Sequence, residues 1–352
     1  MVDVVFEAFD RLVDVDPDSW TSLVQGETHL NGDQQAELLR MLRAWKRRPA
    51  FSIPTCALEE ALDRIGHAVE SDDVPEIPGF TIIRLLGRGG AASVHLAHQD
   101  APVSRTVALK VFHRSSIRGE LLRREARALA RLRHPNLAVL HDVGEAPDGS
   151  PYAVLEYIEG RSIRAWCTEA RPSLADVVRV FGQVCHAVSH ANENGIIHRD
   201  LKPSNILVQE IDGVPVAKVL DFSIAAALSA TQEETVTEER LIAGTPEYMS
   251  PEQADPTLGP CTTRSDVYSL GILLYELLAG RHPIQETREK TPSLFATLKA
   301  ISAGVDVPPS RAGSDRGANG SDPRWGPKAI RGDLDAIVLK AVRPNPEDRY
   351  AS

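Results

Sequence analysis

The chain has 352 residues, of which 42% are hydrophobic, and its formal net charge is -10 at pH 7. This length allows two or three structural units with a sizeable core, and the negative charge argues against nucleic acid as a main partner. The four cysteines form no C-x-x-C pair. They are therefore interpreted as buried or free thiols of a reducing compartment rather than as a disulfide framework.

Residues 1–75 are predicted to form a helical N-terminal extension. Apolar residues recur at helical spacing in the segments 5–13 and 38–45. The region carries no basic segment followed by a long apolar run, so a secretory signal is not predicted. No chemistry is assigned to it, and we interpret it as an appendage that packs or docks. A polar stretch with two prolines at 71–79 then forms a hinge.

After the hinge the pattern changes to that of strands, which are predicted at 80–86, 93–98 and 106–112. The glycine-rich turn 87–90 joins the first two strands. Glycines at such a turn let backbone N–H groups come close to phosphates. Because glycine-rich hairpins are common, this signal alone is weak.

Lys110 lies near the end of the third, apolar strand. An unpaired ammonium is costly to bury, so Lys110 is expected to contact anions. Farther along, the segment 120–133 is predicted to be a charged amphipathic helix and 152–158 a strand. A helix predicted at 174–194 ends before Gly195.

The stretch 198–205 reads His-Arg-Asp-Leu-Lys-Pro-Ser-Asn and places an acid, a cation and an amide in one short loop. The Asp200 carboxylate can accept a proton from an attacking hydroxyl. The Lys202 ammonium can neutralise a transferring phosphoryl group, and Asn205 can hold a divalent metal. This set of residues predicts phosphoryl transfer. The alternative is a basic surface loop before a strand.

The same stretch resembles the catalytic loop of protein kinases, which is written H-R-D-L-x-x-x-N. Further motifs follow in the order of that family. The segment 107–110 resembles V-A-I-K, 221–223 resembles D-F-G, and 244–252 resembles the end of the activation segment. The lysine at position 202 and the threonine at position 245 resemble the residues that serine/threonine kinases, rather than tyrosine kinases, carry at these motif positions. The chain thus resembles a bacterial, eukaryotic-like serine/threonine protein kinase.

The resemblance covers residues 80–352 and implies an α+β, two-lobed protein-kinase fold. A small antiparallel sheet forms the N-lobe at 80–157, a mostly helical C-lobe spans 160–352, and ATP binds in the cleft. Residues 304–332 are rich in Gly, Pro and Ser and are predicted to be a long surface loop before a helix at 334–342. Because kinase domains usually carry a further helix after this point, the sequence leaves open a continuation past Ser352.

The resemblance also implies the catalytic roles. Asp200 would orient the substrate hydroxyl and accept its proton, and Lys202 would offset charge on the γ-phosphoryl group. Lys110 would align the triphosphate and pair with a helix glutamate, for which Glu125 is preferred over Glu120. The expected metal is Mg²⁺, with Mn²⁺ as an alternative. The implied metal ligands are Asn205 and Asp221.

The implied ATP site includes the glycine-rich turn and the end of the strand 152–158. The backbone of Glu156 and Ile158 would bond the adenine edge, and Val94, Ala108 and Leu207 would sandwich the ring. By composition alone these are ordinary core residues. The implied ATP-binding residues are Gly87, Arg88, Gly89, Gly90, Ala91, Ala92, Ser93, Val94, Ala108, Lys110, Glu156, Ile158 and Leu207.

Two positions depart from the kinase motifs. Ala92 stands where the loop has its third glycine, and Ser223 replaces the glycine of D-F-G. Both departures motivate one alternative, a pseudokinase that acts as a nucleotide-binding signalling scaffold. A small-molecule phosphotransferase is a second alternative, because such enzymes share an H-x-D-x-x-x-x-N loop. It would not be expected to carry the Thr-rich segment that closes at 244–247.

The segment 225–243 is polar, acidic and rich in Thr, and it is expected to be an activation loop. In kinases an arginine directly before the catalytic aspartate marks control by phosphorylation of that loop. Autophosphorylation is expected at Thr237, and the alternative is an unmodified, solvated acidic loop. The implied regulatory residues are Arg199, Thr235, Thr237 and Thr245.

The resemblance gives other residues structural roles. Glu252 and Arg349 are expected to form a buried ion pair, and Asp266 to brace the catalytic loop from a buried helix. Phe222 is expected to pack with Leu129 and His198 under the helix predicted at 120–133. The expected partners are ATP and protein substrates, with no nucleic acid and no membrane segment within this chain. A cytoplasmic location is expected, and the sequence leaves open a membrane anchor beyond Ser352.

Overall fold

The computed structural model describes residues 19–26, 32, 35, 36, 38, 39, 76–89, 92–100, 103–113, 132–222, 246–285, 294–312 and 325–352. The chain divides into two units, Met1–Val74 and Pro75–Ser352. In the first unit, helix α2 spans Trp20–Gly26 and buries Trp20 and Val24. These residues are four positions apart and therefore share one helix face. The apolar segment 5–13 lies outside the described residues.

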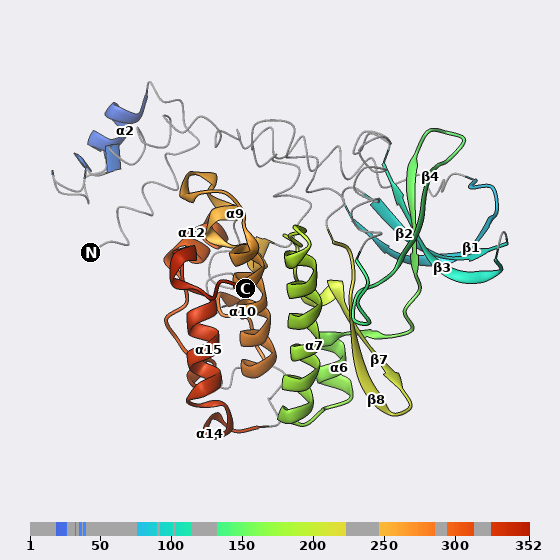
Figure 1. Ribbon diagram of the computed structural model, residues 1–352. Helices are drawn as coiled ribbons and strands as arrows, with labels where there is room; N and C mark the ends of the chain where they lie inside the picture. Colours follow the sequence, from blue (N-terminus) through green and yellow to red (C-terminus); the bar gives the residue numbers. More distant parts are fainter. Residues whose placement is uncertain are drawn as a thin grey trace. The chain divides into compact units, whose positions relative to one another are not determined.

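The second unit begins with a five-stranded antiparallel sheet of order β1-β2-β3-β5-β4 (Figure 1). Alternate residues of these strands point to one face, where Ala97, Val107, Leu109 and Val154 form an apolar core. The strands are β1 Phe80–Arg88, β2 Ala92–Gln99, β3 Arg105–Phe112, β4 Leu140–Glu145 and β5 Pro151–Glu156.

The glycine-rich turn is shorter than the sequence predicted. Gly87 and Arg88 belong to β1, where they pair with Val94 and Ser93 of β2. The Gly89 amide donates to the Ala92 carbonyl at 2.9 Å and closes the hairpin. Because a glycine is tolerated within this paired strand, the pairing of β1 with β2 extends through Gly87 and Arg88, into the segment 87–90 that was predicted to be a turn.

A three-stranded sheet of order β6-β7-β8 follows in the chain and packs against helices. Strand β6 spans Arg161–Ser162, β7 Ile206–Ile211 and β8 Val214–Val219. Asp212 and Gly213 join β7 to β8, both with positive φ (52° and 75°). This is the conformation of a tight two-residue hairpin turn, which Asp-Gly favours.

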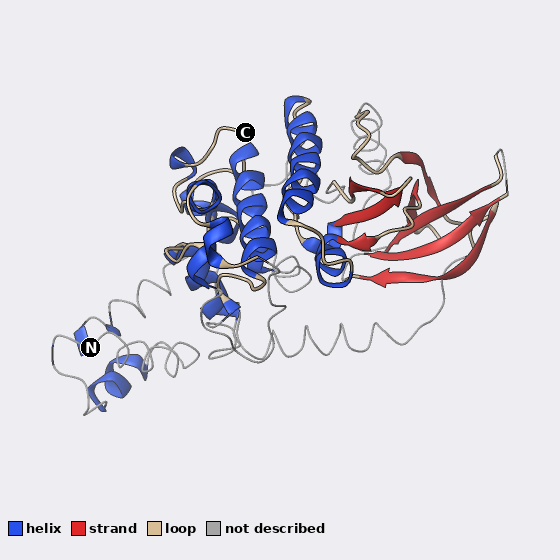
Figure 2. Ribbon diagram, turned by 90° about the horizontal axis from the view of Figure 1, so that it is seen from below, coloured by secondary structure: helices blue, strands red, loops and turns tan. Residues whose placement is uncertain are grey.

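Helices make up the remainder of the second unit, and in Figures 1 and 2 they gather on the opposite side from the five-stranded sheet. Helix α10 lies between α7 and α15 and contacts both (Figure 1). The α-helices are α6 Ile163–Glu169, α7 Leu174–Glu193, α9 Pro251–Ala254, α10 Thr263–Ala279, α12 Leu294–Ala303, α13 Pro309–Ala312, α14 Pro327–Ile330 and α15 Asp333–Ala341. Short 3-10 turns occur at Pro203–Asn205, Pro246–Tyr248, Pro256–Leu258 and Pro346–Asp348.

Helix α10 is the centre of this helical part, because every residue from Ser265 to Ala279 is buried. The Thr262 side chain caps its first turn, and Gly280 ends it with φ 72°, the left-handed conformation that glycine adopts most readily. A helix that is buried on all sides needs partners for its polar groups. Asp266 finds such partners in the catalytic loop, as described below.

The segment 304–332 is not one long surface loop, so that prediction was wrong. It contains α13, in which Pro309, Ser310 and Ala312 are buried, and α14. The Ser310 amide and hydroxyl both donate to the Asp335 carboxylate, at 3.0 and 2.6 Å. This contact with α15 supplies the stability that so short a helix lacks by itself.

Candidate active site

The loop between α7 and β7 is held in place by one buried carboxylate. Asp266 of α10 accepts hydrogen bonds from the backbone amides of His198 and Arg199, each at 2.9 Å. Asn192, near the end of α7, donates to the same carboxylate at 2.9 Å. Burial raises the pKa of Asp266, and the His198 imidazole and the two amides oppose that effect. Arg199 has φ 63°, a conformation that a non-glycine residue adopts only where its surroundings fix it.

Three side chains of this loop converge on one another. Lys202 Nζ lies 2.9 Å from Asp200 Oδ2. Asn205 Nδ2 donates to the same oxygen at 3.0 Å and to the Asp200 carbonyl at 2.7 Å. No donor in the described part of the chain occupies Asp200 Oδ1, and 42% of the Asp200 side chain is exposed. The carboxylate is thus oriented from one side and accessible from the other.

A second carboxylate comes from the segment after β8. Asp221 Oδ1 lies 2.9 Å from Lys110 Nζ of β3. Burial by itself would raise the pKa of Asp221, but the Lys110 ammonium, with smaller contributions from His198 and Lys202, holds the pKa below its ordinary value. Asp221 is therefore ionised at neutral pH.

Backbone and ring contacts join the two segments. The Leu220 amide donates to the Asn205 carbonyl at 2.8 Å, and His198 Nε2 bonds the Leu220 carbonyl at 2.9 Å. The predicted contact of Phe222 with His198 is present, with ring centroids 4.6 Å apart. These contacts bring the oxygen donors Asn205 and Asp221 into neighbouring positions.

The predicted ion pair of Glu252 and Arg349 is present and fully buried. Arg349 Nη1 and Nη2 donate to the two carboxylate oxygens at 2.8 and 2.9 Å, and the side chains are 1% and 0% exposed. Burial would raise the pKa of Glu252, but Arg349 and the Ser265 hydroxyl lower it further than burial raises it. The next residue, Gln253, donates to the Arg199 carbonyl at 2.7 Å and so links α9 to the catalytic loop.

With this geometry in view, comparison with known proteins shows that residues 80–350 match the protein kinase domain. The chain belongs to the protein kinase family. This kinase is 35% identical over 276 residues to serine/threonine-protein kinase PrkC of Bacillus subtilis. It is 38% identical over 279 residues both to PknB of Mycobacterium tuberculosis and to Pkn1 of Myxococcus xanthus.

These alignments cover 77 to 78% of the kinase chain but only 36 to 40% of the relatives. The chain therefore spans less than half the length of the curated relatives that it matches. Within its described residues, no helix is both long and apolar enough to cross a bilayer.

The segment after β5 shows which backbone groups are free for a nucleotide. The Glu156 amide already donates to the Val139 carbonyl at 2.8 Å, so it is not available as a donor. The Ile158 amide has no partner among the described residues, and the Ile158 side chain is 5% exposed. Ala108 is largely buried, and Val94 and Leu207 are half-buried.

Several predicted site residues lie outside the described residues: Gly90, Ala91, Glu120, Glu125, Leu129, Ser223, Thr235, Thr237 and Thr245. The anion that the structure places against Lys110 is Asp221, whereas the sequence resemblance pointed to Glu125. Sequence reasoning missed the roles of Asn192, Gln253 and Lys218. Of these three, only Gln253 could have been found from the local sequence, because the spacing of Ser250 and Gln253 is that of a helix capping box.

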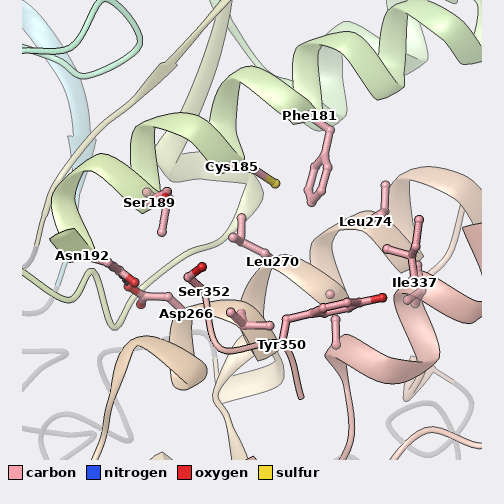
Figure 3. Close-up of a pocket in the computed structure, with 15 residues that line it drawn as sticks. Phe181, Cys185, Ser189, Asn192, Asp266, Leu270, Leu274, Ile337, Tyr350 and Ser352 are labelled. Carbon is pink, nitrogen blue, oxygen red and sulfur yellow. Dashed lines mark hydrogen bonds between the residues drawn. The ribbon is translucent and has the colours of Figure 1, made fainter. Parts of the chain in front are cut away.

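An apolar cavity of about 140 Å³ lies behind the catalytic loop, between α7, α10, α15 and the residues Tyr350 and Ser352 (Figure 3). Asn192 and Asp266, which hold the loop, line one end of it. Cys185 also lines it, and burial raises the pKa of this thiol to about 11. The cavity thus contacts the support of the site rather than Asp200 or Lys110.

Proposed function

We propose that this kinase transfers the γ-phosphoryl group of ATP to serine and threonine hydroxyls of proteins. One observation carries the proposal. Two ion pairs of 2.9 Å, Lys110–Asp221 and Lys202–Asp200, come from three separate segments of the chain and are linked through Asn205 and Leu220. Phosphoryl transfer needs such a set, because it depends on positioning and on compensation of charge.

In the proposed reaction, a substrate hydroxyl binds at Oδ1 of Asp200, which no donor among the described residues occupies. The carboxylate orients the hydroxyl toward the γ-phosphorus and accepts its proton as the new O–P bond forms. The bond between the γ-phosphorus and the oxygen bridging to the β-phosphate breaks, and ADP leaves with that electron pair. Lys202, which is 18% exposed, turns from Asp200 toward the transferring group and offsets its charge. Lys110 binds oxygens of the remaining phosphates.

The donor set fits a hard divalent cation. Asn205 uses its Nδ2 for Asp200, so its amide oxygen, which has no partner in the described segments, can serve as a ligand, and Asp221 contributes a carboxylate. The described residues contain no cluster of three or more His, Cys, Asp or Glu that could hold a metal alone. Mg²⁺ is usually bound through one or two protein oxygens together with phosphates and water, so Asn205 and Asp221 would hold Mg²⁺ with ATP. The ion would supply positive charge at the β- and γ-phosphates; Mn²⁺ is the alternative.

The choice of serine and threonine as acceptors rests on Lys202 and on the names of the relatives, which are serine/threonine-protein kinases. The pseudokinase alternative gains no support, because Lys110, Asp200, Asn205 and Asp221 are all present in one site. We further propose that residues 1–75 act as an extension outside the catalytic domain. Regulation through Arg199 and phosphorylation of Thr237 remains part of the proposal.

The proposal is tested by incubating the purified chain with γ-labelled ATP, Mg²⁺ and a generic basic protein, followed by acid hydrolysis. Label is expected in phosphoserine and phosphothreonine, with none in phosphotyrosine. Omission of metal, or excess chelator, should abolish transfer. ATP binding without any labelled protein would contradict the proposed activity and would favour the pseudokinase alternative.

A further inference from the structure

Lys218 is a buried cation whose role none of the kinase motifs explains. It lies on β8, three residues before Asp221, and only 9% of the residue is exposed. Its ammonium donates to both carboxylate oxygens of Glu156, at 2.8 and 2.9 Å, and approaches the Leu137 carbonyl at 3.5 Å. Glu156 is the last residue of β5 and stands two residues before Ile158.

Glu156 holds a third segment as well. The Val139 amide donates to Glu156 Oε2 at 3.1 Å, and the Glu156 amide donates to the Val139 carbonyl at 2.8 Å. The segment 136–139 is also bonded directly to β8. The Val219 amide donates to the Asn136 carbonyl at 2.8 Å, and the Ala138 amide donates to the Val219 carbonyl at 2.9 Å.

The ion pair therefore joins the two sheets. Glu156 belongs to the five-stranded sheet and Lys218 to the three-stranded sheet. Ile158, whose amide has no partner within the described part of the chain, follows Glu156 by two residues, and the proposed metal ligand Asp221 follows Lys218 by three. A shift of either sheet against the other would move these two groups apart.

We infer that Lys218 and Glu156 are positioning residues that set the distance between the adenine-binding backbone and the metal-binding carboxylate. The inference rests on the proposed function, which assigns the metal and the phosphates of ATP to Asp221 and its neighbours. It also uses the family resemblance, which assigns the adenine edge to the backbone at Glu156 and Ile158. Among the described residues, the Lys218 ammonium contacts the Glu156 carboxylate and the Leu137 carbonyl rather than Asp221. Its effect is exerted through β8 and through the segment 137–139.

The alternative is that the pair only stabilises the fold. A buried ion pair commonly contributes little by itself, but removing one partner leaves an uncompensated charge. Both roles predict a loss of stability in single variants. Only the positioning role predicts a selective change in the affinity for ATP, so the two roles differ in a measurable quantity.

The test compares Lys218→Met, Glu156→Gln and the double variant with the wild type, using the full chain. In Lys218→Met the KM for ATP is expected to rise about tenfold, the ratio that corresponds to about 1.4 kcal/mol. The kcat and the KM for the protein substrate should change much less. Glu156→Gln keeps an acceptor for the Val139 amide and should show a smaller rise. The double variant should be closer to the wild type than Lys218→Met, because it leaves no charge unpaired.

Arg179→Met is the matched control. It removes an exposed ion pair with Asp176, on the same helix that leads to the catalytic loop, and should leave the KM for ATP unchanged. An unchanged KM for ATP in both Lys218→Met and Glu156→Gln, with only lowered melting temperatures, would overturn the inference. If Lys218→Met does not fold, the KM for ATP is compared between the wild type, Glu156→Gln and the double variant instead.

The inference and the proposed function can fail separately. Binding of Mg·ATP is measured for each variant from the shift that it produces in the melting temperature. A wild type that bound Mg·ATP but transferred no phosphate would contradict the proposed function. The variants' binding would still report on the pair, since equal shifts in wild type and Lys218→Met would contradict positioning, and a weaker shift in Lys218→Met would support it.

Discussion

Lys110 on β3 and Asp221, two residues after the end of β8, form an ion pair of 2.9 Å that joins the five-stranded sheet to the segment following the three-stranded sheet. Asp221 has φ 49°, a left-handed conformation that costs free energy for most side chains and is adopted most readily by Asn, Asp and Gly. The carboxylate is thus presented to the ammonium by an unusual backbone geometry. Lys110 in turn keeps the pKa of Asp221 low, so the acid is ready to bind a metal cation.

From this pairing we predict that Lys110→Met and Asp221→Asn abolish phosphoryl transfer while the fold is retained. Each removes a charge that acts on the nucleotide and its metal, and a loss of at least about 100-fold in kcat is expected. Asn suits the backbone conformation of Asp221, so that variant isolates the charge. Steady-state kinetics and circular dichroism check the prediction, with Arg161→Met, at an exposed ion pair, as the control. Wild-type kcat in Lys110→Met would refute the role of this lysine.

The buried pair of Glu252 and Arg349 should make stability depend on pH. The pKa of Glu252 is lowered from 4.5 in the folded state. The unfolded chain therefore takes up the proton first, and the stabilisation is present above about pH 4.5 and is lost as the pH falls toward the folded pKa. At pH 7 the Glu252→Gln variant should lose about 3 to 5 kcal/mol, because Arg349 is left buried and unpaired.

Melting temperatures of wild type and Glu252→Gln between pH 7 and pH 3 measure this effect. The difference between the two proteins should be largest at neutral pH and should shrink below about pH 4.5. A difference that stayed constant through the acid range would show that the charge of Glu252 contributes nothing.

Local patterns in the sequence were sufficient to predict strands β1, β2, β3 and β5 and the catalytic loop, whereas β4, β6 and β7 were not predicted. The pair Glu252–Arg349 was predicted from the family resemblance. Each motif has its own residue types at fixed spacing. The contacts of Lys218 with Glu156 and of Asn192 with Asp266 could not be predicted in this way. They join residues 62 and 74 positions apart, and neither pair belongs to a motif that would have indicated the contact. Helix α13 was missed for a related reason. Its proline and serine are typical of a loop, and the contact that stabilises the helix comes from Asp335 of α15, which is distant in the sequence.

Ser223→Gly is predicted to preserve or raise activity. Ser223 lies outside the described residues, and the prediction rests on its place in the D-F-G motif. Glycine there would restore backbone freedom at positive φ that serine lacks. The kcat of the variant should equal or exceed that of the wild type at saturating ATP. A clear drop in kcat would show that the serine itself contributes, for instance through its hydroxyl.

Thr237, also outside the described residues, is predicted to become autophosphorylated. A phosphate there would carry roughly two negative charges, and Arg199, which directly precedes the catalytic Asp200, is the motif arginine expected to pair with it and order the loop. Peptide mass spectrometry after incubation with Mg·ATP should find the modification in the wild type and not in Asp200→Asn. An active enzyme without any modification between Ser229 and Thr237 would exclude this switch.

The measurement that tests the account most directly is the comparison of wild type and Asp200→Asn for both ATP binding and phosphoryl transfer. Asn at position 200 keeps the shape of the side chain and removes the base. We expect Mg·ATP to bind both proteins with affinities within about threefold, because Asp200 acts on the hydroxyl rather than on the nucleotide, while kcat falls at least about 100-fold. Undiminished transfer by Asp200→Asn would contradict the assignment of Asp200 and with it the proposed mechanism.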